Sequence, residues 1–443
     1  MGVIMQAFYW DCPRLEGREY AWWSCVTGKV TSLRKAGFTA LWLPPPYKAA
    51  NLGGPSMGYD PYDYYDLGAI DQKGARETWF GSEDELRALI TAAHDQGMQV
   101  YADVVFNHNS GGDAPEVNPL DNVTRWTRFN PGSKKFPRDY KCFHPSPYET
   151  WDGGTFGDMP DVCHRDPYVY EQIIEFARFL LEDVGFDGFR YDCVKGYGGW
   201  MTRAIQELRA LREGRVFKPF GVGECWDSDR VITDWLDETN AWSDNPAAAF
   251  DFPLRDRLKN LADTYGYSLT NLAAAGTLVG ERPAQAVTFV ENHDVARSNP
   301  IINGKMLAYA YILTHEGYPC VFWQDYYNWQ LGREGAADGI AALVGAHEQY
   351  AGGATAILYA DEVLYVMQRC GFGAQPGLVA VINNLGDRWN GRAVKTQWGS
   401  TRLAPAAWGG QDRATPQEKW TDAQGWAELW APPRGYAVYV PRP

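Results

Sequence analysis

Three acidic residues stand where short apolar runs give way to loops, and their types and spacing suit catalysis. Asp192 ends Gly188-Phe-Arg-Tyr-Asp192, Glu224 ends Phe220-Gly-Val-Gly-Glu224, and Asp294 ends Val287-Thr-Phe-Val-Glu-Asn-His-Asp294. When a glycosidic bond is cleaved, one carboxylate can act as nucleophile and another as general acid. A single acid at a strand-to-helix turn is more commonly a structural hydrogen-bond partner or a helix N-cap. The hypothesis therefore depends on whether the fold brings the three together.

A barrel of parallel strands would do so, because its catalytic residues lie at the carboxyl ends of the strands. Short alternating or wholly apolar runs and helical segments follow each other through three-quarters of the chain, which indicates βα units around a parallel sheet. Eight such runs favour an α/β fold of the (β/α)8, or TIM-barrel, type over an open doubly wound sheet. The predicted strands are Val3 to Trp10, Thr39 to Leu43, Gln99 to Phe106, Gly188 to Tyr191, Phe220 to Gly223, Ala248 to Phe252, Ala286 to Val290 and Tyr318 to Trp323.

Two of the connecting helices have clear signals. The first begins at the capping box Ser82-Glu-Asp-Glu85 and is closed by Gly97. The second, Glu171 to Val184, is apolar over much of its circumference. A helix packed between a barrel and its neighbours is expected to have that pattern.

Two segments depart from the alternation. From about Asn107 to Arg165 the chain is rich in Gly, Pro, Asp and aromatic residues, and a loop of this length is expected to be a small inserted subdomain. After about Ala351, short alternating runs separated by turn residues predict an antiparallel β module. The predicted domains are a barrel of residues 1–106 and 166–350, an inserted subdomain B of 107–165, and a C-terminal β-sandwich-like domain of 351–443.

Length, charge and hydropathy limit the classes of partner that the chain is expected to bind. The length of 443 residues suits a barrel with an appended module. A net charge of −14 with scattered basic residues argues against nucleic acid and anionic lipid, and no run approaches the roughly 18 apolar residues that a spanning helix needs. The start Met1-Gly-Val-Ile-Met5 lacks signal-peptide features. We expect an extracellular, mature chain without its signal peptide, with a cytoplasmic location as the alternative.

The cysteines and aromatic residues give weaker signals. Eight cysteines show no C-x-x-C spacing, and Cys193, Cys225 and Cys320, in or beside apolar runs, are expected to be buried thiols. Cys142 and Cys163 bracket a loop and suit either a disulfide or a metal site. The 19 Trp, 26 Tyr and 19 Phe suit stacking on sugar rings, although packing is the commoner use of such side chains.

Four motifs in order resemble those of the α-amylase family, glycoside hydrolase family 13. They are Asp103-Val-Val-Phe-Asn-His108, Gly188-Phe-Arg-Tyr-Asp192, Gly223-Glu224 and Phe289-Val-Glu-Asn-His-Asp294. The resemblance covers nearly the whole chain, and it is closest in look to archaeal-type and maltooligosaccharide-forming α-amylases. It implies a retaining, endo-acting hydrolase of internal α-1,4 bonds in starch and related glucans.

The resemblance also implies a role for each acid. Asp192 would be the nucleophile, kept ionised by Arg190 on the same strand face. Glu224 would be the general acid and later the base, which requires a raised pKa in an apolar setting. Asp294 would hydrogen-bond the distorted sugar. Asp192 and Glu224 should then lie roughly 5 to 5.5 Å apart, as in retaining enzymes.

Further positions match those that bind substrate in the family. The tyrosine would stack under the sugar in subsite −1, the histidines would contact its hydroxyls, and the lysine and tryptophan would meet the leaving-group side. Packing or capping is the alternative role for each. The residues are Tyr59, His108, Arg190, Lys195, Trp226 and His293.

The resemblance implies calcium as a cofactor. Calcium takes six to eight oxygen ligands from carboxylates, amides and carbonyls. The matching positions would clamp the inserted segment to the barrel, with ordinary turn formation as the alternative. They are Asn107, Asp152, Asp161 and the backbone carbonyls of Gly154 and Gly196.

Zinc is a second candidate cofactor. His144 and Cys163 match two zinc ligands of archaeal-type relatives. The third ligand position, a histidine in those relatives, falls near Tyr148 and Glu149, so the sequence departs from the pattern there. The Glu149 carboxylate is an alternative ligand through oxygen.

The expected partners are starch, amylose and maltooligosaccharides, bound by a monomer. One alternative stays within the same chemistry: an α-glucan transglycosidase or a maltooligosaccharide-forming amylase, which would differ in the acceptor or in the product length. Another is a non-catalytic carbohydrate-binding protein on the same barrel. The three intact acids argue against it.

Overall fold

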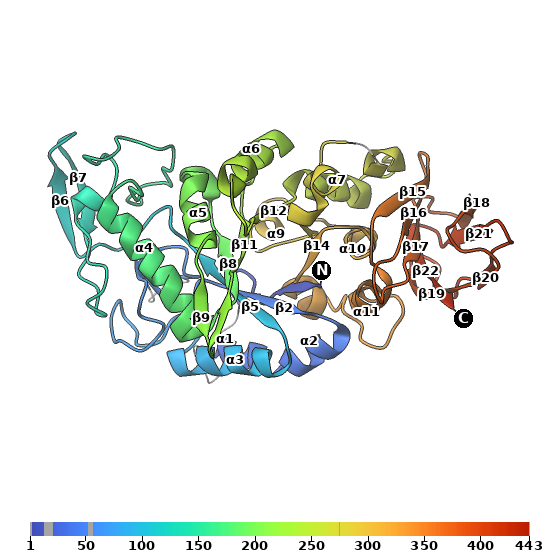
Figure 1. Cartoon of the computed structure of the whole chain (residues 1–443), viewed down its shortest axis with the longest axis horizontal. Helices are drawn as coiled ribbons and strands as arrows, with labels where there is room; N and C mark the ends of the chain where they lie inside the picture. The colour runs from blue at the N-terminus through green and yellow to red at the C-terminus, as the bar shows by residue number, and fades with distance from the viewer. Residues whose placement is uncertain (1, 13–20, 52–55, 274, 443) are drawn as a thin grey trace. The chain divides into compact units, whose positions relative to one another are not determined.

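The eight predicted strands form a closed barrel in the computed structural model, which describes residues 2–12, 21–51, 56–273 and 275–442. The strand order is β1-β14-β13-β12-β11-β8-β5-β2, with parallel pairing, so the predicted barrel is confirmed (Figure 1). Met1, the first residue of the predicted barrel domain, lies outside the described residues. The barrel strands are β1 (Ile4–Gln6), β2 (Ala40–Leu43), β5 (Gln99–Val104), β8 (Gly188–Tyr191), β11 (Phe220–Gly223), β12 (Ala248–Phe250), β13 (Ala286–Phe289) and β14 (Tyr318–Phe322).

Burial explains why the barrel strands read as nearly continuous apolar runs. Every residue of β2, β8, β13 and β14 is buried. A parallel sheet is covered on both faces, so both sets of alternating side chains leave water. The sequence signal for these strands is therefore hydrophobic run length rather than alternation.

The chain divides into two compact units by its internal contacts. The first comprises Trp10–Thr31 and Ala40–Phe250, and the second comprises Met1–Tyr9, Ser32–Thr39 and Asp251–Pro443. The helices of the first unit are α1 (Trp22–Thr27), α3 (Glu83–Asp95), α4 (Pro167–Phe179), α5 (Gly199–Gln206) and α6 (Asp229–Asn240). Those of the second unit are α7 (Phe252–Asp263), α8 (Leu278–Glu281), α9 (Val295–Ser298), α10 (Lys305–Ile312) and α11 (Ile340–Tyr350). Helix α2 (Val30–Ala36) begins in the first unit and continues into the second from Ser32.

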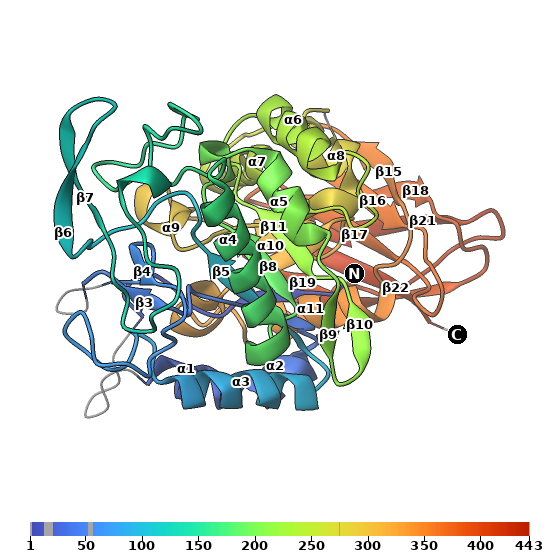
Figure 2. The same ribbon diagram turned by 60° about the vertical axis from the view of Figure 1, so that its left-hand side comes forward.

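The two predicted helices are present, and the second begins earlier than predicted. The hydroxyl of Ser82 accepts from the Glu85 amide at 3.3 Å, and Glu85 accepts from the Ser82 amide at 3.1 Å, which completes the capping box of α3. Helix α3 lies beside α1 (Figure 2). Helix α4 begins at Pro167 because the Asp166 side chain caps it, and the last turn, Leu180–Val184, is π-helical.

Irregular chain and short β elements make up the segment 107–165. A hairpin of β6 (Ala114–Asn118) and β7 (Val123–Arg128) stands in it, followed by one 3-10 turn, Tyr140–Cys142 (Figure 1). This arrangement agrees with the lack of a long helical period in the sequence. The domain boundaries 107–165 and 351–443 stay a proposal. The remaining short strands of the first unit are β3 (Lys48–Ala49), β4 (Pro61–Asp63), β9 (Ala210–Arg212) and β10 (Arg215–Phe217).

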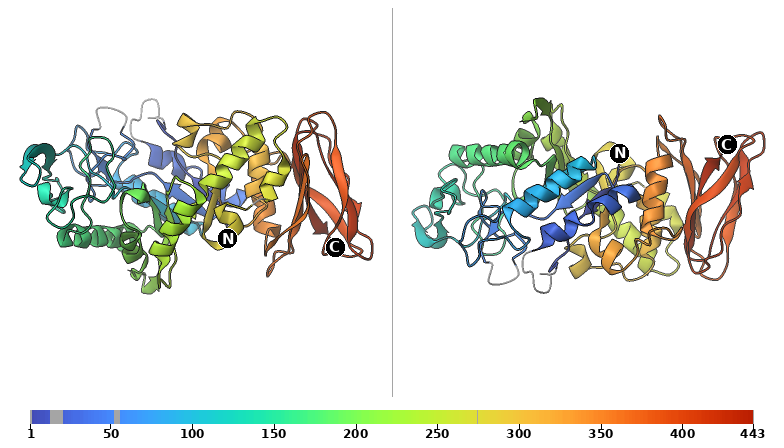
Figure 3. Two further views of the ribbon diagram at one scale, coloured as in Figure 1. Left: turned by 90° about the horizontal axis from the view of Figure 1, so that it is seen from above. Right: turned by 90° about the horizontal axis from the view of Figure 1, so that it is seen from below.

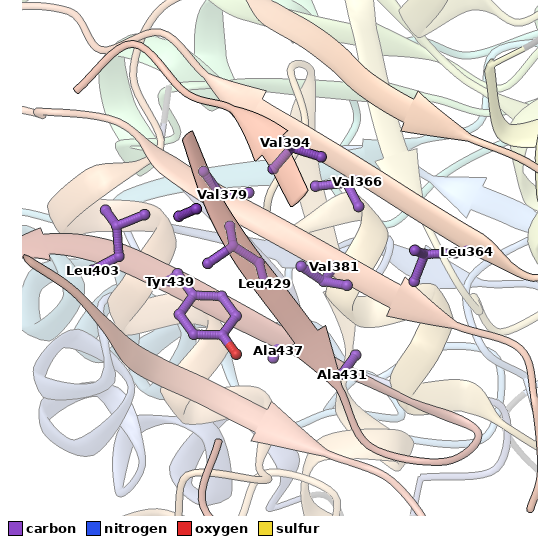
Figure 4. Packing of buried hydrophobic residues seen from close by; sticks show 11 residues of the cluster. Leu364, Val366, Val379, Val381, Val394, Leu403, Leu429, Ala431, Ala437 and Tyr439 are labelled. Carbon is purple, nitrogen blue, oxygen red and sulfur yellow. The ribbon is translucent and has the colours of Figure 1, made fainter. Parts of the chain in front are cut away.

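Antiparallel strands fill the last part of the chain, as predicted. Figure 3 shows these strands in orange and red at the C-terminal end of the chain. A six-stranded sheet has the order β15-β16-β17-β22-β19-β20, and β18 pairs with β21 in a two-stranded ribbon. Valine and leucine side chains of both sheets share one buried core (Figure 4). The strands are β15 (Thr355–Ala360), β16 (Leu364–Arg369), β17 (Leu378–Asn383), β18 (Asn390–Lys395), β19 (Arg402–Gly409), β20 (Lys419–Trp420), β21 (Trp426–Ala431) and β22 (Gly435–Arg442).

No helix among the described residues is both long enough and apolar enough to cross a membrane. All eight cysteines lie in the described part of the chain, and none of them forms a disulfide among the described residues. The disulfide alternative for Cys142 and Cys163 is therefore wrong for this structure. Cys225 and Cys320 are buried as predicted, whereas Cys193 is partly exposed.

Candidate functional site

Strand register in the first unit brings four charged residues to one place. Asp103 of β5 pairs with Arg190 of β8, and Tyr191 of β8 pairs with Gly223 of β11. Asp192 and Glu224 therefore each follow a paired residue at neighbouring strand ends. Because side chains on a strand alternate, Arg190 and Asp192 point to the same face.

Arg190 contacts all three acids of this cluster. Its guanidinium is fully buried, and its Nη1 donates to Asp192 Oδ1 at 2.6 Å and to Asp103 Oδ1 at 2.9 Å. Its Nη2 lies 2.8 Å from Glu224 Oε2 in an ion pair. The predicted contact between Arg190 and Asp192 is therefore present, and the same cation also reaches Glu224.

One guanidinium faces three carboxyl groups, so the cluster has an excess of acid. Burial raises the pKa of Asp103 to about 6, although Arg190 opposes the shift. Burial acts to lower the pKa of Arg190, but Asp103, Glu224 and Asp192 outweigh it and raise that pKa well above its ordinary value. Since one positive charge cannot compensate three negative ones, the cluster favours holding a proton near neutral pH.

Glu224 is also held by the backbone. The amide of Cys193 donates to Glu224 Oε2 at 3.2 Å, and Cys193 has a left-handed φ of 45°. That conformation is costly for a residue with a side chain, and it turns the amide toward the acid. Both Asp192 and Glu224 are buried, with 7% and 8% of their surface exposed.

Tyr59 lies beside the cluster, where the sequence predicts a sugar platform. Its hydroxyl donates to Asp103 Oδ2 at 2.8 Å, and its ring stacks on Trp10 with 5.7 Å between centroids. Trp42 Nε1 donates to the same Asp103 oxygen at 3.1 Å. Asp103 therefore joins the tyrosine to the guanidinium, which fixes both.

His108 is a neutral, oriented ring. Burial lowers the pKa of His108, and its Nε2 lies 2.9 Å from the carbonyl oxygen of Tyr59. Its Nδ1 lies 3.2 Å from the side-chain Nδ2 of Asn107. The half-exposed ring of Phe156 stacks on the imidazole, with 4.6 Å between centroids and 9° between planes. A contact from His108 to a sugar stays a prediction.

Lys195 and Trp226 lie together at the surface. The Lys195 ammonium donates to the Trp226 carbonyl at 2.8 Å and to Asp227 Oδ2 at 3.0 Å. The Trp226 side chain is 41% exposed. The predicted pair is thus brought together, with Lys195 three residues after Asp192 and Trp226 two residues after Glu224.

Asp294 and His293 stand after β13 in the second unit. His293 is buried, its Nδ1 lies 3.0 Å from Gln6 Nε2, and its ring is 5.0 Å from that of Phe8. His293 Nε2 lies 3.2 Å from Asp294 Oδ2. The Asp294 side chain is 34% exposed, so a ligand could reach it.

The capping alternative does not account for Asp294. Within the described residues, its side chain makes no capping hydrogen bond to α9. The turn is held instead by Asn292 Oδ1, which accepts from the amides of Asp294 at 3.0 Å and Val295 at 2.9 Å. The Asp294 carboxylate is therefore available for another role.

Oxygen atoms predicted for calcium converge in the first unit. The segment after β5 runs beside residues 160–162, because the Val162 amide donates to the Asn107 carbonyl at 2.9 Å. A Cβ placed on Gly154 would lie 2.3 Å from the Gly196 carbonyl oxygen, 2.6 Å from Asp161 Oδ1 and 2.7 Å from Asn107 Oδ1. Among the described residues, neither side-chain oxygen has a hydrogen-bond partner, although both are buried. Unsatisfied buried oxygens of this kind fit a hard cation.

His144 stands on the other side of Asp161. Its Nδ1 lies 3.1 Å from Asp161 Oδ2 and its Nε2 3.6 Å from Glu149 Oε2. Burial acts to lower the pKa of His144, but Asp161 raises it to about 10. His144, Glu149 and Cys163 have ligand atoms within 4.8 Å of one another, whereas Tyr148 is 55% exposed. The structure thus places the Glu149 carboxylate, rather than the Tyr148 side chain, beside His144 and Cys163.

Three residues of the site lacked a predicted role: Asp103, Trp42 and Phe156. Asp103 stood in a quoted motif, and pairing the third predicted strand with the fourth would have placed it opposite Arg190. Trp42 lies in the next predicted strand around the barrel. Phe156 comes from irregular chain, where no periodic signal exists.

A closed parallel barrel with acids just past the carboxyl ends of its strands defines the TIM-barrel class of enzymes. The family profile described as alpha amylase, catalytic domain, matches residues 16–327, and the one described as alpha-amylase C-terminal matches 378–440. The chain belongs to the α-amylase family of glycoside hydrolases.

Individual relatives agree with this assignment. The α-amylase of Geobacillus stearothermophilus is 33% identical over 384 residues, which cover 74% of this chain and 67% of the relative. The glucan 1,4-alpha-maltohexaosidase of Bacillus sp. (strain 707) is 32% identical over 380 residues, with 74% and 71% covered. The crystal structure of the α-amylase from Geobacillus thermoleovorans, complexed with acarbose, has a TM-score of 0.70 at 21% identity and covers 100% of this chain and 98% of that one, which shows the shared fold.

Proposed function

We propose that the protein is an endo-acting α-amylase, which hydrolyses internal α-1,4-glucosidic bonds of starch and related glucans with retention of configuration. The observation that carries the proposal is the pair of carboxyl groups, Asp192 and Glu224, held at neighbouring strand ends by one buried guanidinium. A nucleophile and a general acid that contact the same guanidinium suit double displacement.

In the proposed reaction, Asp192 attacks the anomeric carbon, and the bond to the leaving oxygen breaks as Glu224 gives that oxygen a proton. This forms a covalent glycosyl-enzyme. Glu224 then takes a proton from water, whose oxygen displaces Asp192. Arg190 supports the first step because it favours the ionised form of Asp192. The excess of acid in the cluster supports the presence of a transferable proton.

Asp294 and His293 are proposed to bind the reacting sugar. The carboxyl ends of parallel barrel strands open on the same side, and these two residues follow β13 just as the other acids follow β8 and β11. Tyr59, His108, Lys195 and Trp226 are proposed to line subsites on either side of the scissile bond.

The products of starch digestion test this function. We expect soluble starch to lose viscosity before much sugar is released, and new reducing ends to appear as a ladder of maltooligosaccharides. Longer or cyclic glucans without new reducing ends would show a transglycosidase instead. A single short product from the first minutes would show a maltooligosaccharide-forming enzyme.

Calcium is the proposed cofactor, held by Asn107 Oδ1, Asp161 Oδ1, the Asp152 carboxylate and the Gly154 and Gly196 carbonyls. The ion would join the segment 107–165 to β5. Removing it with EGTA should lower the thermal midpoint, and adding calcium at about 100 times its Kd should restore roughly 2.7 kcal/mol of stability.

The variant Asp161→Asn should lose this calcium response, because it removes charge from the converging oxygens. The exposed Asp158 supplies a matched control, and Asp158→Asn should respond like the wild type. Equal midpoints of the wild-type protein in EGTA and in calcium would refute the site.

Zinc is a further proposed cofactor, at His144, Glu149 and Cys163. A nitrogen, a carboxylate oxygen and a thiolate are ordinary zinc ligands. The wild-type protein purified without chelators should then contain one zinc by elemental analysis, and Cys163→Ser should contain less.

We also propose a cellular location and an oligomeric state. A polymeric substrate favours action outside the cell, as a monomer. One relative, 29% identical over 449 residues, is named cytoplasmic alpha-amylase, of Escherichia coli (strain K12). Cell fractionation and size-exclusion chromatography with light scattering would decide both points.

A further inference from the structure

A pocket on the C-terminal β module uses none of the residues proposed for catalysis. It lies beside the two-stranded ribbon of β18 and β21 and has a volume of about 470 Å³. That volume is within the range of small-molecule sites, roughly 300 to 1,000 Å³. Its lining residues are Trp389, Ala414, Thr415, Pro416, Gln417, Lys419, Glu428 and Trp430.

The alternation of β21 separates this pocket from the core. Ala427, Leu429 and Ala431 are buried in the core of the module. Figure 4 shows the last two among the packed side chains. Glu428 and Trp430, the residues between them, point to the opposite face of the strand. The pocket is therefore a feature of the outer face, supported from behind by a packed core.

The Trp430 indole lies flat against the neighbouring strand. Trp430 pairs with Gly391 of β18, and a Cβ on Gly391 would lie only 2.5 Å from Trp430 Cγ. The glycine thus leaves room for the indole to lie against the neighbouring strand, while the rest of the side chain lines the pocket. The buried Tyr439 fixes the Trp430 backbone, because its hydroxyl donates to the Trp430 carbonyl at 2.8 Å.

Trp389 is the second fixed indole of the pocket. Its Nε1 donates to Asp412 Oδ2 at 2.7 Å. Asp412 Oδ1 also accepts from the Ala414 amide at 2.9 Å, which anchors the start of the loop 414–417 that lines the pocket. One aspartate therefore orients both the ring and the loop.

The polar groups of the pocket identify the class of ligand. Lys419 and Glu428 supply one positive and one negative charge, so the pocket has no net preference for an anion or a cation. Gln417 and Thr415 add neutral donors and acceptors. Two indoles with a rim of mixed hydrogen-bonding groups suit a neutral ring that has apolar faces and hydroxyl edges.

We propose that this pocket is a second glucan-binding site, which holds an α-1,4-glucan chain through Trp389 and Trp430. The choice of glucan rests on the proposed function, because the pocket chemistry itself specifies a neutral sugar. Such a site raises retention on a polymer without taking part in bond cleavage.

Binding to starch granules at 4 °C tests this site, with kcat/KM on soluble maltoheptaose measured in parallel. Trp430→Ala should weaken granule binding about three- to tenfold, the scale of one aromatic contact. Glu428→Ala should weaken it about twofold or more through one lost hydrogen bond. Trp420→Ala is the matched control, because Trp420 belongs to the same module, is 67% exposed and does not line the pocket.

Unchanged kcat/KM on maltoheptaose is expected in all three variants. Granule binding that stays at the wild-type level in both Trp430→Ala and Glu428→Ala would overturn the proposal, as would an equal loss in Trp420→Ala. If Trp430→Ala fails to fold, as circular dichroism would reveal, the exposed Glu428 decides the case. A wild-type protein that does not cleave maltoheptaose would refute the proposed function, while the granule comparison would still judge the pocket.

Discussion

Replacing Glu224 with glutamine is expected to lower kcat on soluble starch by about 10²- to 10⁴-fold, the usual contribution of general acid–base catalysis. Glutamine keeps the shape of the side chain and can still accept from the Cys193 amide, which now lies 3.2 Å from Glu224 Oε2. It cannot give a proton to the leaving oxygen. KM should change little, because the substitution removes an interaction made in the transition state.

The control for this variant is Glu207→Gln, an exposed glutamate at the end of α5. Its activity should equal that of the wild type. Reducing-end assays on both proteins, with equal thermal midpoints, would separate chemistry from folding. Starch cleavage at the wild-type rate by Glu224→Gln would remove Glu224 from the mechanism.

Replacing Arg190 with methionine is expected to destabilise the protein by about 3 to 5 kcal/mol at pH 8, in addition to abolishing activity. The change leaves Asp103, Asp192 and Glu224 without their common buried cation. Breaking a buried ion pair by removing one partner costs that much because a buried charge stays uncompensated.

The pH dependence of this loss follows from Asp103. Its folded pKa is raised to about 6, above that of an unfolded aspartate, so its contribution to stability is present at low pH and is lost as pH rises through about 6. Without Arg190 the carboxyl groups should hold protons to still higher pH. Denaturant unfolding should therefore show a smaller difference between wild type and Arg190→Met at pH 5 than at pH 8.

A second substitution sharpens the test. Asp103→Asn in the Arg190→Met background removes one of the uncompensated acids, so it should recover part of the lost stability at pH 8 and none of the activity. A loss of stability that is equal at pH 5 and pH 8 would show that packing, rather than charge, explains the effect of Arg190.

The barrel could be predicted from the sequence because its strands are buried on both faces and read as apolar runs. The pairing of Arg190 with Asp192 was predictable for a related reason, since a spacing of two places side chains on one strand face. Helix α4 was predicted to start too late, because the prediction relied on apolar periodicity and overlooked the Asp166–Pro167 start signal.

Residues whose role depends on pairing between strands or on irregular chain were harder to predict. Asp103 acquires its role from its register with Arg190, and Glu149 from a loop that carries it to His144 and Cys163. The roles of Asp192, Glu224 and Asp294 stay predictions, and so does the separation of 5 to 5.5 Å between the first two. Loop geometry and cross-strand register have no local sequence period, which is why the positions of Asp103 and Glu149 could not be predicted from the sequence.

The anomeric form of the first product tests whether the reaction is a double displacement through Asp192. Proton NMR of maltoheptaose, recorded in the first minutes after the protein is added, distinguishes the α- and β-anomers of each new reducing end before they interconvert. The α-anomer should form first, because two displacements restore the configuration of the α-1,4 bond. A β-anomer that forms first would show a single displacement by water and would contradict Asp192 as the nucleophile.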